Sequence, residues 1–197
     1  MQEFQKRSKI AFDSFQQKLK KSNIYRNTLW HGDLWTTNIL FKFDNIISLD
    51  CRLVDFQLIR YCPPAQDLMS HVYLTTEKKT RAKFLPVLLK EYYEELTNIV
   101  TSFGLDVEKV FSFKEFQVSC EYMRCQGVCV ALLYAPINLT KAEDRLTIFG
   151  DEDNFDRIMK NDRREFIQAM MSKYPFYRER IGELVEDFYE LCEKEQY

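Results

Sequence analysis

Glycine is scarce in this sequence. The five glycines stand far apart, at positions 32, 104, 127, 150 and 182. A phosphate-binding loop needs several glycines close together, because its backbone must curl around the phosphate and direct N–H groups at the oxygens. The spacing therefore excludes a loop of the Walker A type within these 197 residues.

Paired cysteines and long apolar runs are lacking as well. None of the six cysteines forms a Cys-x-x-Cys pair or a Cys/His cluster with the spacing of zinc ligands. The longest apolar run, residues 127–137, is too short to cross a bilayer, and the first residues contain no apolar core of a signal peptide. The net charge of −2 gives no general attraction to nucleic acid. We therefore expect a cytoplasmic protein that binds neither nucleic acid nor membrane.

Apolar residues are numerous enough for a sizeable core. They make up 46% of the chain, and we predict a single domain over residues 1–197. Helical periodicity predominates, and two short β-rich runs lie on either side of the turn signal Asp44-Asn45. The expected fold class is α+β, mostly α, with a small β-hairpin. The predicted helices cover residues 3–21, 65–74, a segment that ends near 103, 113–134, 154–172 and 175–195; the strands cover 39–43 and 51–56, and a loop covers 138–153.

Four residues are expected to mark helix ends. Ser112 has Glu115 three positions later, which is the spacing of a capping box. Gly104 suits the position just after a helix, where the backbone often turns left-handed. Pro86 is expected in the first turn of its helix, and Pro136 is expected to end the helix that Ser112 begins.

Three oxygen-bearing side chains are arranged around the two predicted strands. Asp33 and Asn38 lie five residues apart on a segment that runs into the first strand, and Asp55, seventeen residues after Asn38, ends the second. Hard cations such as Mg²⁺ take oxygen ligands, so Asn38 and Asp55 are candidate metal ligands. Asp33 would then orient an acceptor hydroxyl, which is the arrangement of a kinase-type phosphoryl-transfer site.

Each of these residues also has a simpler interpretation. An aspartate in a loop is most often a turn or cap residue, so a single one carries little weight. The order of all three, each beside an apolar strand, favours the functional interpretation. His31 is expected to be structural, with its imidazole bonded to backbone near Asp55, and His71 to be an interior or boundary residue of a helix. Trp30 and Trp35 are expected to pack against the loop.

Three segments carry a more specific pattern: His31-Gly32-Asp33-Leu34-Trp35-x-x-Asn38-Ile39-Leu40-Phe41, Val54-Asp55-Phe56-Gln57-Leu58 and Pro64-Ala65-x-Asp67-Leu68. They resemble the CHK-kinase-like group, also described as the ecdysteroid-kinase-like family, which is related to choline kinases and aminoglycoside phosphotransferases within the protein-kinase-like fold. The resemblance covers about residues 29–74. The later helices are compatible with the family by architecture only.

The resemblance implies a protein-kinase-like C-terminal lobe that uses ATP and Mg²⁺ to phosphorylate a hydroxyl of a small molecule, such as an ecdysteroid or another lipophilic alcohol. It implies that Asp33 is the catalytic aspartate and that Asn38 and Asp55 bind the metal. Asp67 is expected to be structural and to brace the catalytic loop.

A kinase of this kind also needs an N-terminal lobe, with a glycine-rich loop, a strand lysine and a helix glutamate, all of them upstream of the catalytic loop. Only residues 1–30 precede that loop here, so we expect the C-terminal lobe alone and weak ATP binding. The apolar surface that faces the missing lobe is expected to be exposed and to meet a protein partner. The alternative is a non-catalytic, kinase-derived module that binds a small molecule or a protein.

Overall fold

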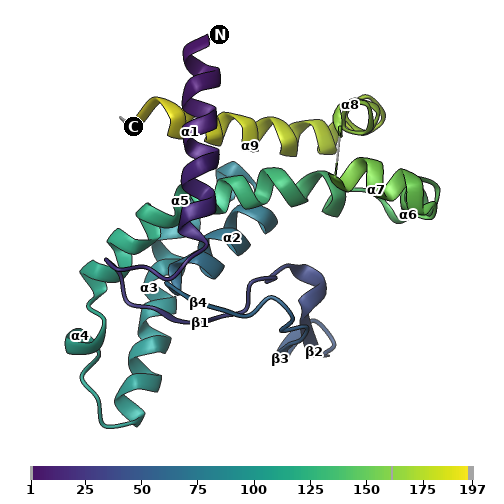
Figure 1. The fold of residues 1–197 in the computed structure, drawn as a ribbon. Helices are drawn as coiled ribbons and strands as arrows, with labels where there is room; N and C mark the ends of the chain where they lie inside the picture. Colours follow the sequence, from purple (N-terminus) through teal and green to yellow (C-terminus); the bar gives the residue numbers. More distant parts are fainter. Residues whose placement is uncertain (1, 161, 195–197) are drawn as a thin grey trace.

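The computed structural model describes residues 2–160 and 162–194, and helices predominate in this part of the chain (Figure 1). Two pairs of short antiparallel strands accompany them. The predicted class, α+β and mostly α, is confirmed. The elements are α1 (Gln2–Lys18), β1 (Thr28–Trp30), the 3₁₀ turn η1 (Thr36–Asn38), β2 (Ile39–Asp44), β3 (Ile47–Leu53), β4 (Arg60–Cys62), α2 (Ala65–Thr75), α3 (Lys78–Ser102), α4 (Val107–Val110), α5 (Phe113–Asn138), α6 (Ala142–Phe149), α7 (Glu152–Lys160), α8 (Arg164–Lys173) and α9 (Pro175–Lys194).

The predicted β-hairpin is present as β2 and β3. Ile39 pairs with Leu53 at its base, and Asp44 pairs with Ile47 next to the turn. Asn45 has a φ of 54° there, a left-handed conformation that asparagine tolerates and that a tight hairpin turn requires. The second strand was expected over residues 51–56 but lies at Ile47–Leu53, because a two-residue turn obliges the returning strand to start directly after it.

A second antiparallel pair, β1 with β4, has no counterpart in the prediction. It joins three residues on each side, with Trp30 opposite Arg60 and Thr28 opposite Cys62. Strands of three residues contain too few alternations for a period-2 pattern to be recognised. This pair nevertheless fixes the chain directly before the loop, because β1 ends at Trp30 and the loop begins at His31.

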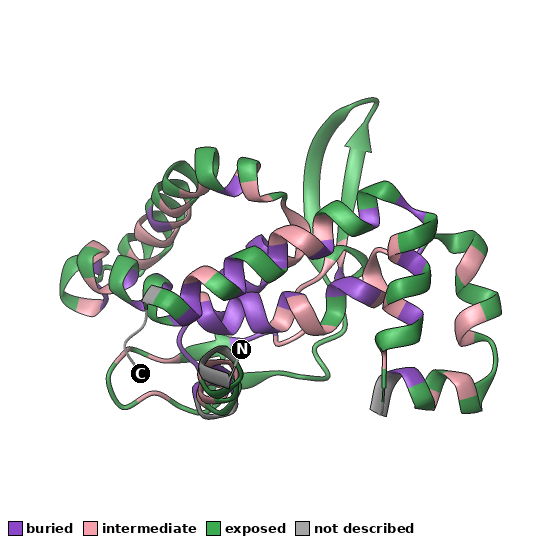
Figure 2. Cartoon of the chain, turned by 90° about the horizontal axis from the view of Figure 1, so that it is seen from above, coloured by how far each residue is buried: buried purple, intermediate pink, exposed green. Residues whose placement is uncertain are grey.

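The core is built around the close packing of α2 against α5. Gly127 of α5 makes it possible, because a Cβ at this position would lie 2.8 Å from the backbone oxygen of Met69 in α2. Helix α5 is buried on many sides, as its apolar composition predicts (Figure 2). Buried residues of α1, α2, α3, α4, α7, α8 and α9 join its core cluster. The packing fixes α2, and with it the two residues of α2 that contact the loop after β1, Asp67 and His71.

Two predicted helix ends agree with the structure. The hydroxyl of Ser112 accepts a hydrogen bond from the Glu115 N–H at 3.1 Å, although the Glu115 carboxylate completes no capping box and accepts from the backbone of Arg26. Gly104 follows the last residues of α3 with a φ of 73°, and its N–H donates to Thr101 O at 2.8 Å.

The expectations from proline and from polar composition were wrong. Pro136 lies inside α5, which continues to Asn138, and Pro86 lies in the interior of α3, not in its first turn. Residues 138–153 are not a loop, because α6 forms there with Glu143 and Asp144 in its first turn. The Tyr174 hydroxyl lies 2.6 Å from an oxygen of each carboxylate and can donate to either, so tertiary contacts hold this polar helix.

Three other predicted helices differ at their bounds. The helix expected over residues 3–21 ends at Lys18, and the last helix, expected to reach 195, is described to Lys194, with residue 195 outside the described part. The helix expected over 154–172 is two helices, α7 and α8. Arg163 stands between them and donates to Ile158 O at 2.8 Å and Leu133 O at 2.6 Å, which ties the end of α7 to α5.

The β2–β3 hairpin stands away from the helical body and is exposed on both faces (Figure 2). Its exposed side chains include many that are large and apolar. The apolar residues exposed on the hairpin are Leu40, Phe41, Phe43, Ile46, Ile47, Leu49 and Leu53.

No helix of the described residues combines the length and apolar content needed to cross a membrane.

A buried ion pair joins the start of α3 to α9. The guanidinium of Arg81 donates to the carboxylate of Asp187 and to the backbone oxygen of Thr76, and both charged side chains are 5% exposed. The same guanidinium lies 4.6 Å from the ring centre of Tyr73, a cation–π contact. Asp187 is the ion-pair partner of Arg81, and the more exposed Lys78, 4.0 Å from the Asp187 carboxylate, adds a weaker second contact.

Replacing one partner of this pair should cost much more stability than replacing both. We expect Arg81→Met to lower the free energy of unfolding by about 3 kcal/mol, because it leaves the buried Asp187 carboxylate with the partly exposed Lys78, 4.0 Å away, as its remaining counter-charge. The double variant Arg81→Met/Asp187→Leu should recover most of that loss, as measured by urea unfolding. Lys79→Met, which removes an exposed pair with Glu77, is the control and should change little. Equal stabilities of the single and double variants would contradict the prediction.

Candidate active site

The segment between β1 and β2, residues 31–38, is the candidate catalytic loop. Gly32 has a φ of 87°, and a Cβ built on it would lie 2.3 Å from the backbone oxygen of Leu58. Any other L-residue would therefore be strained and would collide with the chain that leads into β4. This glycine is required at its position both by backbone conformation and by close approach.

Asp67, in the first turn of α2, holds the start of the loop. Its two carboxylate oxygens accept hydrogen bonds from the backbone N–H of His31 at 2.6 Å and of Gly32 at 3.1 Å. Burial raises the pKa of Asp67 to about 6, against the opposing effect of these two N–H donors. The carboxylate thus connects the helical body to the loop at the point where the loop begins.

His31 connects the loop to the strand end before Asp55. Its Nδ1 accepts from the N–H of Asp33 at 3.3 Å, so its Nε2 carries the proton and donates to Val54 O at 2.8 Å. The imidazole is buried and lies 4.5 Å from the Phe56 ring, measured between ring centres. Both ring nitrogens bind backbone groups, so His31 positions the chain at Asp33 and the chain just before Asp55.

The structure brings Asp33 and Asn38 into direct contact. The side-chain nitrogen of Asn38 donates to Asp33 O at 2.8 Å and to the Asp33 carboxylate at 3.1 Å. The loop is closed further by the N–H of Trp35, which donates to Asp33 O at 3.0 Å. Because the nitrogen of Asn38 faces Asp33, its oxygen, which accepts a long hydrogen bond of 3.5 Å from the Thr37 hydroxyl, is the atom that can bind a cation.

Asp55 follows β3 and is held near the end of the same loop. The N–H of Val54 donates to Asn38 O at 3.0 Å, which joins the two strand ends. Asp55 has a φ of 66°, unusual for a residue other than glycine and typical of functional sites. Its carboxylate is exposed and accepts from the Gln57 side chain at 3.3 Å. The structure therefore places an amide oxygen and a carboxylate at neighbouring strand ends.

The donor chemistry of Asn38 and Asp55 fits Mg²⁺. Among the described residues no group of three or more His, Cys, Asp or Glu side chains could hold a metal. The expected site has two protein ligands, and one of them is an amide. Mg²⁺ is commonly bound in this way, through one or two carboxylates, with substrate phosphates and water completing its coordination.

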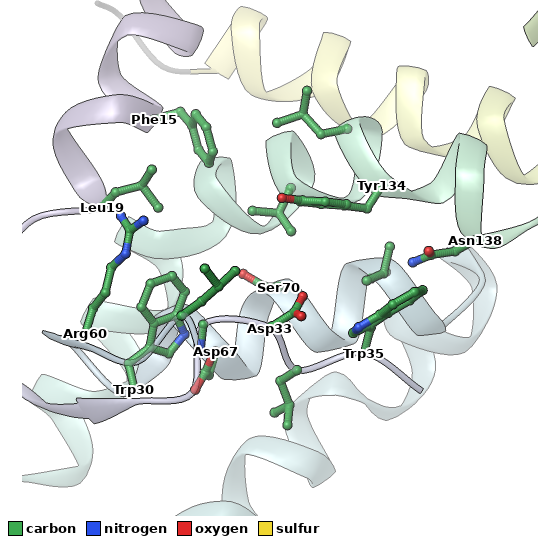
Figure 3. A pocket seen from close by; sticks show the side chains of 16 residues that line it. Phe15, Leu19, Trp30, Asp33, Trp35, Arg60, Asp67, Ser70, Tyr134 and Asn138 are labelled. Carbon is green, nitrogen blue, oxygen red and sulfur yellow. Dashed lines mark hydrogen bonds between the residues drawn. The ribbon is translucent and has the colours of Figure 1, made fainter. Parts of the chain in front are cut away.

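A pocket of about 250 Å³ opens beside Asp33 (Figure 3). Its walls come from α1, β1, the loop, β4, α2 and α5, and they are mainly apolar, with Trp30 and Trp35 among them. In Figure 3 the carboxylate of Asp33 points into the pocket, and the Tyr134 ring of α5 lies on the opposite side. A small molecule in this pocket would lie against the aspartate.

Three residues of the site were not recognised in the sequence. Arg60 and Tyr134 line the pocket from β4 and α5. His71 was expected to be an ordinary helix residue, but its Nδ1 lies 3.0 Å from Leu34 O and anchors the middle of the loop to α2. No local pattern indicates any of the three, because each reaches the loop through long-range packing.

A family model for the ecdysteroid kinase-like family matches residues 2–105 of the chain. The match spans more than half of the sequence and contains the whole loop, the hairpin and the first turn of α2. The chain belongs to the ecdysteroid kinase-like family. This confirms the resemblance read from the three motifs, and the family indicates a kinase-like phosphotransferase.

The match ends before α5, although α5 supplies one wall of the pocket. Family membership therefore rests on the loop and its supports, and the wall that contains Tyr134 is outside the matched region. No curated protein and no solved structure matches the chain.

The raised pKa of Asp67 predicts a pH-dependent stability. The carboxyl binds its proton more tightly in the folded protein, with a pKa of about 6, than in the unfolded chain, with a value near 3.8. Its contribution to stability is therefore greatest below pH 4 and declines as the pH rises to about 6. We expect the free energy of unfolding of the wild type, relative to Asp67→Asn, to fall by about 3 kcal/mol over this interval. Urea unfolding of both proteins at a series of pH values measures this, and a difference that grows with pH would contradict it.

Proposed function

We propose that this protein transfers the γ-phosphoryl group of ATP to a hydroxyl of a small molecule bound in the pocket beside Asp33. The observation that carries the proposal is the position of Asp33. It lies in the loop of a kinase-like family, is hydrogen-bonded to Asn38, and directs its carboxylate into an apolar pocket. An acceptor in this pocket can therefore place a hydroxyl against the aspartate.

In this mechanism Asp33 accepts a hydrogen bond from the acceptor hydroxyl and aims its oxygen at the phosphorus. Proton transfer to the carboxylate accompanies or follows formation of the new P–O bond, while ADP leaves with the electrons of the broken one. Asn38 restricts the Asp33 carboxylate through its side-chain nitrogen, and His31 holds the Asp33 N–H. Positioning supplies most of the rate in reactions of this class.

Asn38 and Asp55 are the residues that would hold Mg²⁺, which would neutralise charge on the ATP phosphates. The asparagine offers its amide oxygen and the aspartate its carboxylate, from strand ends that Val54 and Asn38 join by a backbone hydrogen bond. Gln57 donates to the Asp55 carboxylate and so restricts its orientation.

The acceptor is proposed to be a lipophilic alcohol, with an ecdysteroid as the example that the family name suggests. Support comes from the walls of the pocket, where aromatic and aliphatic side chains predominate. Burial of apolar surface in such a pocket contributes roughly 25 cal/mol per Å². An apolar body would thus bind against Trp30, Trp35 and Leu133 while a hydroxyl meets Asp33.

A non-catalytic, kinase-derived binding module is the second candidate, and the exposed β2–β3 hairpin favours it. Large apolar side chains on both faces are a feature of surfaces that bind other proteins. We propose that a protein surface covers this hairpin in the working molecule. We further propose a cytoplasmic location, since none of the six cysteines, all within the described residues, is joined in a disulfide.

The two candidates are separated by following labelled phosphate. The purified protein is incubated with γ-labelled ATP, Mg²⁺ and a panel of sterols and simple apolar alcohols, and products are separated from ATP. We expect label on at least one alcohol and none when Mg²⁺ is chelated. If alcohols bind the pocket but none receives label, the binding module is supported and the phosphotransferase is rejected.

A further inference from the structure

Arg60 is placed beside the pocket by the register of the small β1–β4 sheet. It stands directly opposite Trp30, and side chains of directly opposed residues project from the same face of an antiparallel pair. The neighbouring pair, Leu29 and Tyr61, projects from the other face and is 70% and 53% exposed. The register therefore directs Trp30 and Arg60 together toward the pocket.

The guanidinium of Arg60 lies in mainly apolar surroundings. Its central carbon is 6.0 Å from the centre of the Trp30 ring, and Figure 3 shows it extending along the pocket toward Leu19. Of the described residues that line the pocket, Arg60 alone carries a positive charge. Arg60 is itself exposed to solvent, so a ligand can reach it from the mouth of the pocket, and its planar guanidinium suits a carboxylate.

No acidic side chain of the described residues forms an ion pair with Arg60. Two carboxylates line the same pocket, and the hydrogen bonds that each accepts come from the loop and not from Arg60. Asp67 accepts from two backbone N–H groups of the loop, and Asp33 accepts from Asn38. Among the described residues that line the pocket, the arginine is thus the charged group whose donors can bind an anionic group of a ligand, while Asp33 can still accept from a hydroxyl.

We infer that the pocket binds an alcohol that also carries a carboxylate, with Arg60 binding the carboxylate while Asp33 faces the hydroxyl. The inference rests on the proposed function for the role of Asp33 and narrows its substrate class to apolar hydroxy acids. Figure 3 supports the division, since Arg60 lies at one end of the pocket, Asp33 in its middle and Asn138 beyond it. The two polar groups of the ligand are therefore separated by an apolar segment.

The pocket favours a singly charged carboxylate over a phosphate. The planar guanidinium can form two parallel hydrogen bonds to the two oxygens of a carboxylate. A phosphate monoester carries close to two negative charges at neutral pH, and Asp33 and Asp67 on the same pocket would repel it more strongly. A single negative charge gains the contact with Arg60 at a smaller electrostatic cost.

The chain contains a built-in reporter for this test. Its sequence has two tryptophans, and both line the pocket. Intrinsic fluorescence therefore follows ligand binding without signal from other tryptophans. The probes are ω-hydroxyoctanoate and the matching α,ω-octanediol, which share a hydroxyl and an apolar chain and differ in the carboxylate.

We expect the wild type to bind the hydroxy acid about tenfold more tightly than the diol, a difference of about 1.4 kcal/mol. Arg60→Gln should remove that preference and leave diol binding within about twofold, while Arg60→Lys, which keeps the charge, should retain part of it. Arg52→Gln is the matched control: it removes an exposed arginine of β3 that lies outside the pocket, and it should keep the full preference.

Equal binding of acid and diol by the wild type, or a preference that survives Arg60→Gln, would overturn the inference. Failure of both probes to change the fluorescence would overturn it as well. The assay contains no nucleotide, so its outcome is independent of catalysis. If the acid binds in an Arg60-dependent way but no label is transferred from ATP, the proposed function is rejected and this inference stands. If label is transferred to diols and acids are not preferred, the proposed function stands and this inference is rejected.

Discussion

Asp33→Asn should reduce phosphoryl transfer by about 10²- to 10⁴-fold, with most of the loss in kcat. The amide has almost the size of the carboxylate, but it cannot accept the proton of the acceptor hydroxyl. The bond from Asn38 to the backbone oxygen of residue 33, at 2.8 Å, does not involve the altered side chain and should survive. The loop should therefore keep its conformation while the chemistry fails, as measured by label transfer from ATP under saturating acceptor.

The matched control for this variant is Asp44→Asn in the hairpin turn. Asp44 is exposed and contacts the side chain of Asn45, away from the pocket. It loses the same charge, so a general effect of net charge on ATP or acceptor binding would appear in both variants. Equal losses in the two variants would show that the effect of Asp33→Asn comes from net charge, and retention of activity in Asp33→Asn would show that Asp33 has no catalytic role.

Gly32→Ala should destabilise the loop by more than about 2 kcal/mol and abolish both acceptor binding and transfer. Two effects combine at this position. The φ of 87° is unfavourable for alanine, and the new Cβ would lie 2.3 Å from Leu58 O, a backbone atom that can move only if the chain between β3 and β4 moves. Movement there would also displace Arg60 and the pairing of β1 with β4.

Two other glycines separate these effects. Gly104 has a φ of 73° with no atom within 4 Å of an added Cβ, so Gly104→Ala should show only the backbone strain, about 1–2 kcal/mol. Gly182 lies in α9 with no such atom and an ordinary φ, so Gly182→Ala should be neutral or stabilising by up to about 1 kcal/mol. Unfolding by urea and the tryptophan binding assay measure all three variants. If Gly32→Ala resembles Gly104→Ala, the close approach to Leu58 does not constrain the loop.

The hairpin and the main helices follow from short-range patterns. Asn45 marks the turn, Ser112 and Gly104 mark helix ends, and the apolar content of α5 indicates its central place. The failures have a common physical cause. Pro136 removes one N–H donor, which tertiary packing of α5 compensates, and α6 forms from a polar segment because Tyr174 and Lys173 bind its first-turn carboxylates. A local pattern contains no information about such distant partners.

The sequence by itself predicted the chemistry that we propose for the site. The order and spacing of Asp33, Asn38 and Asp55 beside two apolar strands indicate a kinase-like loop, because these side chains act through neighbours that are close along the chain. Only the tertiary structure decided which surfaces meet that loop. Three-residue strands bring Arg60 beside Trp30, and the close packing of α2 with α5 brings Asp67, His71 and Tyr134 to the same place. These contacts join distant parts of the chain and form only when the core is packed. No sequence motif therefore predicts the pocket or the positive charge of Arg60 beside it.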